Sequence, residues 1–457
     1  MGKIRYEKIK RIANGGVWHV LNYLKRRQFK KFVNDKFPSR RGKNAKYSYF
    51  DAICQMFVTC LNKDKRIADT EKIRKSKFET TYYNKSIGHD TVGLLVKSLA
   101  VPNDVVKTDY IQTLKNGMKE VKVSVQQTNI NNFLNNTLIE TAMQFGYLVK
   151  GAEYVLDIDA TVLETKKKDA TITYKMRSGY HPMVVFLNGV PVWIEGRNGN
   201  THAKYDIYNA LKSAIEKIES YGLRISKVRI DSAGFNLGIM KYLHATGKKF
   251  FIRLVRNQKE NEKIYKLLDD GQRLPLILMR DFYGDTYKCV YTKKKGTRLD
   301  KKVEPKLFGV VTNDINMSAE KILDSYNQRA LCEQSFCELK NFFNWHAVPF
   351  INMNENIAYL HVCSMMYIMY KSMVKDISII SLKNACSDIV TETMQLKAFH
   401  AKFMTVFARG KNDTYTFEID DLALKRLFVL LEKVLNQKMV IKGRDYLEGW
   451  DNIVCRT

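Results

Sequence analysis

The feature that most constrains the fold is the order of hydrophobic patterns between residues 153 and 255. Tyr154–Asp159 alternates apolar and polar residues, as a half-buried strand does. Two further β-rich runs, His181–Leu187 and Val190–Glu195, flank the dipeptide Asn188-Gly189, which is typical of a two-residue hairpin turn. The segment is therefore predicted to begin with three strands, of which two form an antiparallel hairpin.

A regular alternation of helix and strand follows this hairpin. The predicted elements are a helix over Ala203–Tyr221, a strand over Ile225–Asp231, a helix over Phe235–Ala245 and a strand over Lys249–Val255. The resulting order, β-β-β-α-β-α-β, predicts an α/β core of the RNase H-like kind. The run Asn198-Gly199-Asn200 after the third strand is either an ordinary turn or part of a site.

The charge balance favours a polyanionic partner. Lys and Arg number 76 against 47 Asp and Glu, a formal net charge of +29. Neutralising phosphates with such side chains releases condensed counterions, so nucleic acid is the expected partner, although a merely soluble cationic protein is the alternative. The 8 cysteines include no CxxC pair, which argues against a zinc site of that spacing and favours a reduced, cytoplasmic setting.

The chain is longer than a single hydrophobic core usually allows, and we expect several regions. No membrane span is expected, because the most apolar stretch, Ala358–Val374, is short and carries a His and a Lys. The predicted regions are a helical DNA-binding region over 1–150, an RNase H-like core over 151–259 and 313–355, a β-rich insertion over 260–312, and a helical region over 356–457 that serves either dimerisation or intrachain packing.

Two basic segments are candidate phosphate contacts. Residues 25–46 hold ten basic residues and one acid, interleaved with aromatics; a solvated helix face is the alternative interpretation. The second segment is a loop between predicted strands of the insertion. The residues proposed to contact DNA are Lys25, Arg26, Arg27, Arg40, Arg41, Lys293, Lys294, Lys295 and Arg298.

One long helix, predicted from Ser318 to about Phe343, carries a polar stripe. At 100° per residue, four side chains at offsets 0, 3, 7 and 14 fall on one narrow face. An acid flanked by two cations and a phenol on such a face suits phosphates beside a carboxylate, whereas a surface Arg–Glu salt bridge is the simpler alternative. The stripe consists of Tyr326, Arg329, Glu333 and Lys340.

Carboxylates in three segments are candidate metal ligands. Asp159 closes the first predicted strand and Asp231 the fourth, and these strands are neighbours in an RNase H-like sheet. Glu333 on the helix completes a set suited to two divalent ions. Asp157 points the same way as Asp159 and stays an alternative, Asp231 could instead be a helix cap, and Glu338, which lies off the stripe, is a lesser rival to Glu333.

These segments together resemble a known family. The run Tyr326–Lys340 is similar to the Y-(2)-R-(3)-E-(6)-K signature of bacterial insertion-sequence transposases of the DDE type, and Leu156–Thr161 and Val228–Ser232 resemble the segments around its aspartates. The resemblance covers about residues 150–360. It implies an RNase H-like catalytic core in which Asp159, Asp231 and Glu333 hold two Mg²⁺ ions, with Mn²⁺ as an alternative. Tyr326, Arg329 and Lys340 then lie near DNA phosphates.

The resemblance also implies an activity and partners. The chain would cut DNA at the ends of a mobile element and join them to target DNA, as a homodimer acting on double-stranded DNA in the bacterial cytoplasm, at the nucleoid. The alternatives are a non-catalytic DNA-binding protein derived from a transposase and another RNase H-fold nuclease. An aromatic of the insertion is expected to stack on a flipped base. The candidates are Phe282, Tyr283, Tyr287 and Tyr291.

Overall fold

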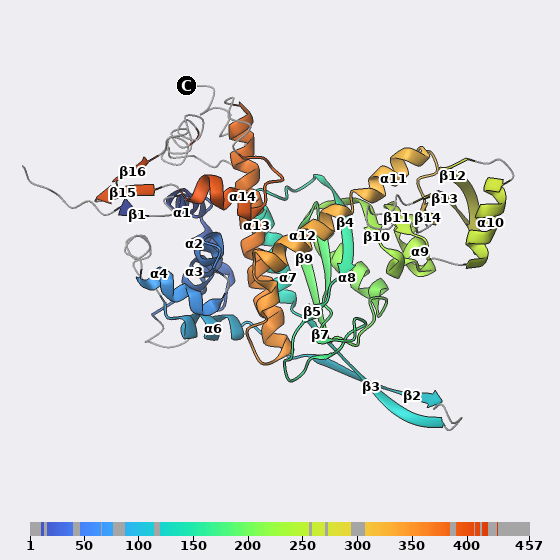
Figure 1. Ribbon diagram of the computed structural model, residues 1–457, viewed down its shortest axis with the longest axis horizontal. Helices are drawn as coiled ribbons and strands as arrows, with labels where there is room; N and C mark the ends of the chain where they lie inside the picture. The colour runs from blue at the N-terminus through green and yellow to red at the C-terminus, as the bar shows by residue number, and fades with distance from the viewer. Residues whose placement is uncertain are drawn as a thin grey trace, which may run out of the picture. The chain divides into compact units, whose positions relative to one another are not determined.

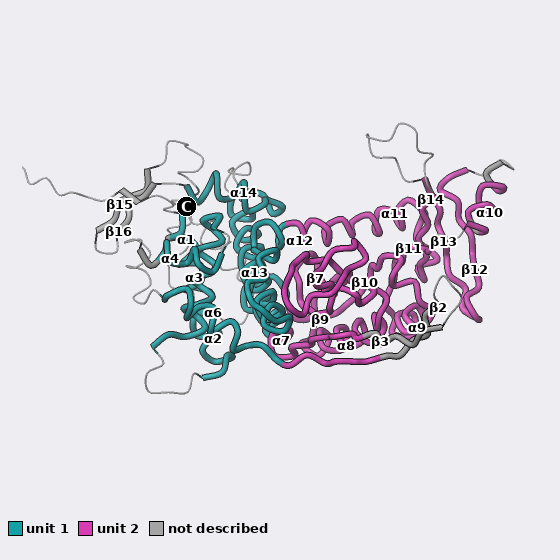
Figure 2. Tube along the Cα trace, turned by 60° about the horizontal axis from the view of Figure 1, so that its bottom comes forward, with its two compact units in different colours: residues 1–101, 137–148, 338–457 teal, residues 102–136, 149–337 magenta. Residues whose placement is uncertain are grey.

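The computed structural model describes most of the chain, which divides into two compact units (Figure 2). Unit 1 comprises residues 1–101, 137–148 and 338–457, and unit 2 comprises residues 102–136 and 149–337. The described residues are 11–12, 16–39, 46–64, 66–75, 87–113, 119–255, 258–269, 273–293, 307–383, 390–405, 407–411, 414–418 and 427.

Unit 2 is built on a ten-stranded mixed sheet with the order β12-β13-β14-β11-β10-β4-β8-β9-β3-β2 (Figure 1). Its central strands are β4 (Glu153–Ala160), β8 (Met183–Leu187), β9 (Val190–Arg197), β10 (Arg224–Ile230) and β11 (Lys249–Arg253). Strands β4, β10 and β11 are parallel, whereas β8 is antiparallel to β4 and to β9. Asn188 and Gly189 have φ values of 46° and 85°, the left-handed conformations that a tight hairpin turn requires. The predicted strands and hairpin are confirmed.

Two helices connect the parallel strands as predicted. Helix α8 (Ile207–Ser220) leads from β9 to β10, and α9 (Leu237–Ala245) leads from β10 to β11. The buried face of α8 follows helical spacing, which is why the sequence identified it. That face consists of Ile207, Ala210, Leu211, Ala214, Ile215 and Ile218.

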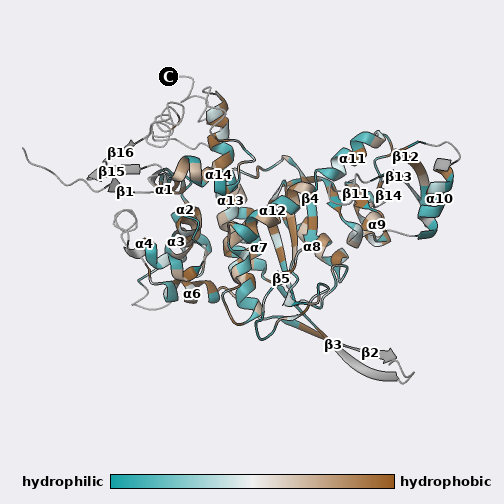
Figure 3. Cartoon of the chain, in the orientation of Figure 1, coloured by the Kyte–Doolittle hydropathy of each residue, from teal (hydrophilic) through white to brown (hydrophobic). Residues whose placement is uncertain are grey.

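The region predicted as a β-rich insertion differs from the expectation in one way. It begins with a helix, α10 (Gln258–Asp269), which is mostly hydrophilic (Figure 3). Its strands β12 (Leu276–Phe282), β13 (Asp285–Lys293) and β14 (Leu307–Thr312) form as predicted, but β14 pairs with β11. The inserted strands therefore extend the central sheet.

The helical prediction for residues 1–150 is wrong between residues 104 and 130. Strands β2 (Asp104–Thr113) and β3 (Lys119–Ile130) form a long hairpin there. The sequence alternates valine with polar residues at 121–125, a β pattern that outweighs helix propensity. Only Thr128–Ile130 of β3 pairs with β9, so the rest of the hairpin extends past the sheet (Figure 1).

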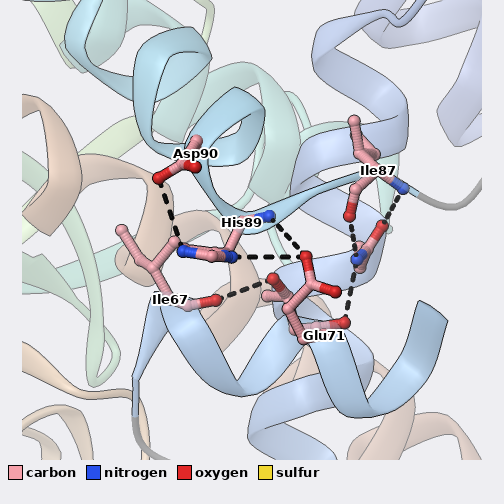
Figure 4. A network of polar contacts seen from close by, with 7 residues as sticks. Ile67, Glu71, Ile87, His89 and Asp90 are labelled. Atoms are coloured by element: carbon pink, nitrogen blue, oxygen red, sulfur yellow. Dashed lines mark hydrogen bonds and ion pairs between the residues drawn. The ribbon is translucent and has the colours of Figure 1, made fainter. Parts of the chain in front are cut away.

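Unit 1 is mainly helical. Its helices include α1 (Val17–Arg26), α2 (Phe29–Lys36), α3 (Tyr49–Leu61), α4 (Thr70–Lys75), α6 (His89–Lys97), α13 (Met353–Lys383) and α14 (Leu396–Phe399), and α7 (Asn132–Gln144) lies partly in it. Glu71 of α4 accepts from the backbone N–H of His89, and the His89 ring contacts both Glu71 and Asp90 (Figure 4). These polar contacts satisfy N-terminal groups of α6, where helix N–H groups lack intrahelical partners.

The prediction that residues 356–457 are helical holds for only part of that region. Strands β15 (Phe407–Lys411) and β16 (Thr414–Glu418) form a hairpin, and β15 pairs with β1 (Arg11–Ile12). The alternation of threonine with aromatic residues over 414–417 favours a strand. Among the described helices, even the 31-residue α13 is not apolar enough to cross a membrane.

His361 of α13 should make unit 1 sensitive to acid. Its ring is fully buried, Nδ1 contacts the carbonyl of Ile357 at 2.8 Å, and burial lowers its pKa from 6.5 to about 4. Because burial disfavours protonation of His361 in the folded state, the contribution of the neutral ring to the free energy of unfolding is fully present above pH 6.5. This contribution is lost as pH falls towards 4. The full loss is about 3 kcal/mol.

We expect the free energy of unfolding of His361→Gln to depend less on pH over this window than that of the parent chain, as measured by urea unfolding. Subtracting the two curves cancels the titration of the carboxyl groups. Parallel curves for the two proteins would show that His361 is not the residue responsible.

Candidate active site

Asp159 and Asp231 occupy equivalent positions at the ends of neighbouring parallel strands. Ile158 of β4 pairs with Ile230 of β10, so the two aspartates follow paired residues at a strand spacing of about 4.8 Å. The Asp231 carboxylate also accepts from the backbone N–H of Ala233 at 2.8 Å and caps a short 3₁₀ turn. The two aspartates therefore follow paired residues of adjacent strands, and Asp231 also has the capping role that was the alternative.

The environment of Asp159 penalises its negative charge. The side chain is 19% exposed, and its pKa is raised to about 6, first by burial and then by the nearby carboxylates of Asp231 and Glu333. The Arg329 guanidinium and the backbone N–H of Ala160 act in the opposite direction. Carboxylates that lie close together at a partly buried position favour a neighbouring cation, because a cation relieves their mutual repulsion.

Asp157, the alternative to Asp159, has a different environment. It is fully buried, and Arg229 engages both its carboxylate oxygens, with Nε–Oδ1 at 2.7 Å and Nη2–Oδ2 at 2.6 Å. Burial raises the pKa of Asp157, and the same guanidinium opposes that shift. This bidentate pair gives Asp157 a structural partner inside the sheet and leaves Asp159 as the aspartate nearer Asp231.

Arg229 was not predicted from the sequence, although its spacing from Asp231 could have identified it as a partner of Asp157. It precedes Asp231 by two residues as Asp157 precedes Asp159, which places opposite charges side by side on neighbouring strands. Its Nη1 donates to the carbonyl oxygen of Ser325 at 3.1 Å, and to the Gln328 side chain at 3.4 Å. Arg229 therefore ties the centre of the sheet to the segment that carries Arg329.

The long helix predicted to run to Phe343 is two helices. Helix α11 (Ala319–Asn327) ends before Gln328, and α12 (Ala330–Asn341) begins after Arg329. Ser318 caps α11 as predicted. The Arg229 contact with a carbonyl oxygen near the end of α11 satisfies a group that helix ends leave without an intrahelical partner. The polar stripe is therefore interrupted, and its members have separate environments.

Arg329 bridges two of the predicted carboxylates. Its Nη2 donates to Oδ2 of Asp159 at 2.6 Å, and its Nη1 contacts Oε1 of Glu333 at 3.5 Å. The salt bridge suggested by the sequence spacing is present but long, whereas the contact with Asp159, 170 residues away in the chain, is short. The Glu333 side chain is 70% exposed.

Tyr326, predicted to contact phosphate, is a core side chain. Burial raises its pKa to about 12, and its ring contacts that of Phe308 at 5.4 Å between centroids. An aromatic ring packs into a core when apolar side chains surround it. The spacing of the polar stripe gave no information about those neighbours. Tyr326 shares its cluster with Phe251, Val290, Val310, Ala319 and Ile322.

The end of α12, from Glu338 onward, falls in unit 1. Lys340 lies in the last turn of α12 and is half-buried. Glu338, the lesser rival to Glu333, is buried. The Phe186 and Phe336 rings make an edge contact at 4.9 Å, and the Ser335 hydroxyl donates to the Gly189 carbonyl at 2.7 Å. These contacts hold the unit 2 part of α12 on the sheet.

Of the basic residues predicted to bind DNA, Arg27 has a structural role instead. It is buried, and its Nη2 contacts Oδ2 of Asp376 at 2.6 Å, with Tyr23 donating to the same oxygen at 2.7 Å. A buried charge needs such a partner. The predicted contact of Arg27 with DNA is therefore replaced by this ion pair, because sequence spacing did not show that Arg27 is buried. Lys25 and Lys293 are exposed and Arg26 is half-exposed. Arg40, Arg41, Lys294, Lys295 and Arg298 lie outside the described residues.

Two of the four aromatics considered for base stacking are buried, and one is prominent on the surface. Tyr287 and Tyr291 pack inside unit 2. Phe282 is half-buried. Tyr283 is 83% exposed in the turn between β12 and β13 and has a φ of 58°. Of these four aromatics, only Tyr283 has a side chain that is mostly exposed.

The carboxylates fit divalent metal ions by chemistry and partly by position. Oxygen ligands from separate segments suit Mg²⁺. Asp159 and Asp231 lie on adjacent strands, and the exposed Glu333 side chain has room to change rotamer. Among the described residues, no three His, Cys, Asp or Glu side chains surround one point as a metal site would. Both oxygens of Asp159 are engaged in this structure, Oδ2 by Arg329 and Oδ1 by the backbone N–H of Ala160.

Comparison with known proteins identifies the family. Residues 114–401, more than half of the chain, match the family described as Transposase DDE domain group 1. No curated protein matches. Among solved structures, the cryo-EM structure of a piggyBac transposase synaptic complex with hairpin DNA is similar, with a TM-score of 0.42 and 11% identity over 96% of this chain and 84% of that one. On the family match, the chain belongs to the DDE transposases of group 1.

Proposed function

We propose that this chain cuts DNA at the ends of a mobile element and joins those ends to target DNA, with Asp159, Asp231 and Glu333 holding two divalent metal ions. The observation that carries the proposal is the pairing of Ile158 with Ile230, which sets two aspartates side by side in a DDE transposase domain. Mg²⁺ is the expected ion, with Mn²⁺ as an alternative, since all three ligands are carboxylates.

The central strands support an RNase H-like core. Their order β11-β10-β4-β8-β9, with β4, β10 and β11 parallel and an antiparallel hairpin on the other side of β4, agrees with the order expected from the sequence. In such a core the ends of β4 and β10 lie together. The catalytic core is therefore proposed to extend from β4 to α12, with the β12–β14 strands as an insertion.

The protein groups have distinct proposed roles. Bound metal ions supply activation of the attacking oxygen and stabilisation of the leaving oxygen. Asp159 and Asp231 are proposed to position those ions rigidly from strand ends, and Glu333 to complete the set from α12. Arg329 presents a planar set of donors that suits carboxylate and phosphate alike, so it is proposed to neutralise charge beside the reacting phosphate.

The spacing of Tyr326, Arg329, Glu333 and Lys340 supports assignment to the bacterial insertion-sequence transposases, with double-stranded DNA as the partner. The exposed basic residues near the end of α1 are proposed to contact the element's ends, and residues 356–457 to contribute to a homodimer that holds two ends. The expected location is the bacterial nucleoid. Asp159 is proposed over Asp157 because Arg229 already engages both oxygens of Asp157.

The test is a cleavage assay on the DNA that flanks the gene. We expect purified protein with Mg²⁺ to nick both flanks at defined positions and to join the cut ends to a plasmid, and we expect EDTA to abolish both products. Scrambled flanks serve as the control substrate. Specific binding to the flanks without any Mg²⁺-dependent cutting would favour the alternative of a non-catalytic DNA-binding protein.

A further inference from the structure

The segment between β4 and β8 forms a small lobe at the end of the strand that carries Asp159. Residues 162–181, here the lysine lobe, contain β5 (Leu163–Glu164), β6 (Thr171–Ile172) and β7 (Ser178–Tyr180), which pair in the order β5-β7-β6. The lobe begins three residues after Asp159. The base of the lobe therefore adjoins the proposed active site, and there the Thr161 N–H donates to the Pro182 carbonyl at 3.0 Å.

The lysine lobe is strongly basic. It holds five Lys and Arg residues against two acids, Glu164 and Asp169, a net charge of +3. Arg177 pairs with Glu164 at 2.8 Å. Lys166 and Lys168 are exposed and Lys167 is half-buried, and within the described part of the chain none of the three forms an ion pair. Three adjacent lysines of this kind attract a polyanion.

The tip of the lobe presents two large side chains to solvent. Tyr174 is 70% exposed and Met176 is 81% exposed. The tip is a closed turn, since the Thr173 N–H donates to the Arg177 carbonyl and the Met176 N–H to the Thr173 carbonyl, both at 2.9 Å. Met176 has a φ of 59°, an uncommon conformation for a residue with a side chain. Such conformations persist where the surroundings enforce them, often at binding sites.

The tip is also supported from behind. The Tyr174 ring contacts that of His181 at 5.5 Å, and the buried His181 contacts the Thr201 carbonyl through Nδ1 at 2.9 Å. A Cβ on Gly199 would lie 2.3 Å from the Thr171 carbonyl oxygen, so the Asn198–Asn200 turn packs directly against the lobe. This turn is therefore a support for the lobe, and the exposed tip is held in place before any ligand arrives.

We propose that the lysine lobe is a sequence-independent DNA-binding surface that holds duplex DNA beside Asp159; this proposal rests on the proposed function. Lysines act as point charges on phosphates, and contacts with phosphates carry no sequence information directly. Tyr174 and Met176 pack against sugars and bases, as exposed aromatic and apolar side chains do on nucleic acid. The expected partner is double-stranded DNA irrespective of its sequence.

The test measures how salt weakens binding to a fluorescein-labelled random-sequence duplex, in EDTA, by fluorescence anisotropy. Each phosphate contact contributes about 0.9 to the slope of log K against log salt, so Lys166→Ala/Lys167→Ala/Lys168→Ala should reduce the slope by about 2 to 3. The matched control, Lys212→Ala/Lys217→Ala/Lys263→Ala, removes the same charge from helices α8 and α10. It should change the slope by less than about 1.

The tip is tested separately with Tyr174→Ala/Met176→Ala, which should weaken binding about fivefold or more while leaving the slope unchanged. Thermal unfolding of each variant confirms that its fold is retained. An unchanged slope in the lobe variant, or an equal loss in the control, overturns the proposal. The proposal is also overturned if the lobe variant binds an RNA duplex more weakly than the parent does but binds DNA equally well.

These outcomes separate the lobe from the catalytic proposal, because the binding assay contains no divalent ion. Cutting of the flanking DNA with Mg²⁺ by the parent chain, together with an unchanged slope in the lobe variant, rejects the lobe alone. If the lobe variant has a reduced slope and the parent chain does not cut, the catalytic proposal is rejected and the lobe proposal stands.

Discussion

Asp231→Asn is expected to reduce Mg²⁺-dependent cleavage of the flanking DNA by about a thousandfold or more. Losing a metal ligand removes several kcal/mol of charge stabilisation, and about 4 kcal/mol corresponds to that factor. The amide oxygen of asparagine can still accept the hydrogen bond from the Ala233 N–H, so the 3₁₀ turn and the fold should be kept. DNA binding measured in EDTA should stay within a few fold of the parent, which separates loss of chemistry from loss of affinity.

The same loss is expected for Asp159→Asn and Glu333→Gln, measured as initial rates of nicking. Glu320→Gln is the matched control, because Glu320 is an exposed acid of α11 that the proposal gives no role. Cutting at the parental rate by Asp231→Asn would show that the assignment of the carboxylates is wrong. A similar loss in the Glu320 control would indicate a general effect of charge.

Breaking the pair of Asp157 and Arg229 is expected to destabilise unit 2 by about 3 to 5 kcal/mol, since removing one partner leaves a buried charge uncompensated. Both side chains are buried, and the pair is bidentate. Arg229→Met and Asp157→Asn should each lower the urea midpoint of unfolding. The double variant Asp157→Leu/Arg229→Met should recover much of the loss, because it buries no charge.

This series also separates Asp157 from Asp159. Asp157→Asn should act mainly on the free energy of unfolding, whereas Asp159→Asn should act mainly on the rate of cleavage. If Arg229→Met unfolds at the parental urea concentration, the pair does not stabilise the sheet, and the reason for preferring Asp159 is lost.

The sequence of elements in the core and the positions of Asp159 and Asp231 at the ends of strands followed from local patterns. The alternation of Tyr154–Asp159 and the Asn188-Gly189 turn depend on neighbouring residues alone, because side-chain direction and turn conformation are local properties. At the break between α11 and α12, by contrast, the backbone and side chains contact Arg229, which is 96 residues away from Ser325 in the chain. Sequence periodicity contains no information about such a partner.

The sequence by itself determined that the chain is basic, that its core contains the order β-β-β-α-β-α-β, and that acids close two of the strands, with Asp157 and Asp159 as alternatives on the first. Only the tertiary structure decided that Asp157 is paired with Arg229, that Arg329 reaches Asp159, and that Arg27 and Tyr326 are buried. The physical reason is that periodicity reports which face of an element a side chain lies on. The partner on that face comes from a distant segment and becomes known only when the elements pack together.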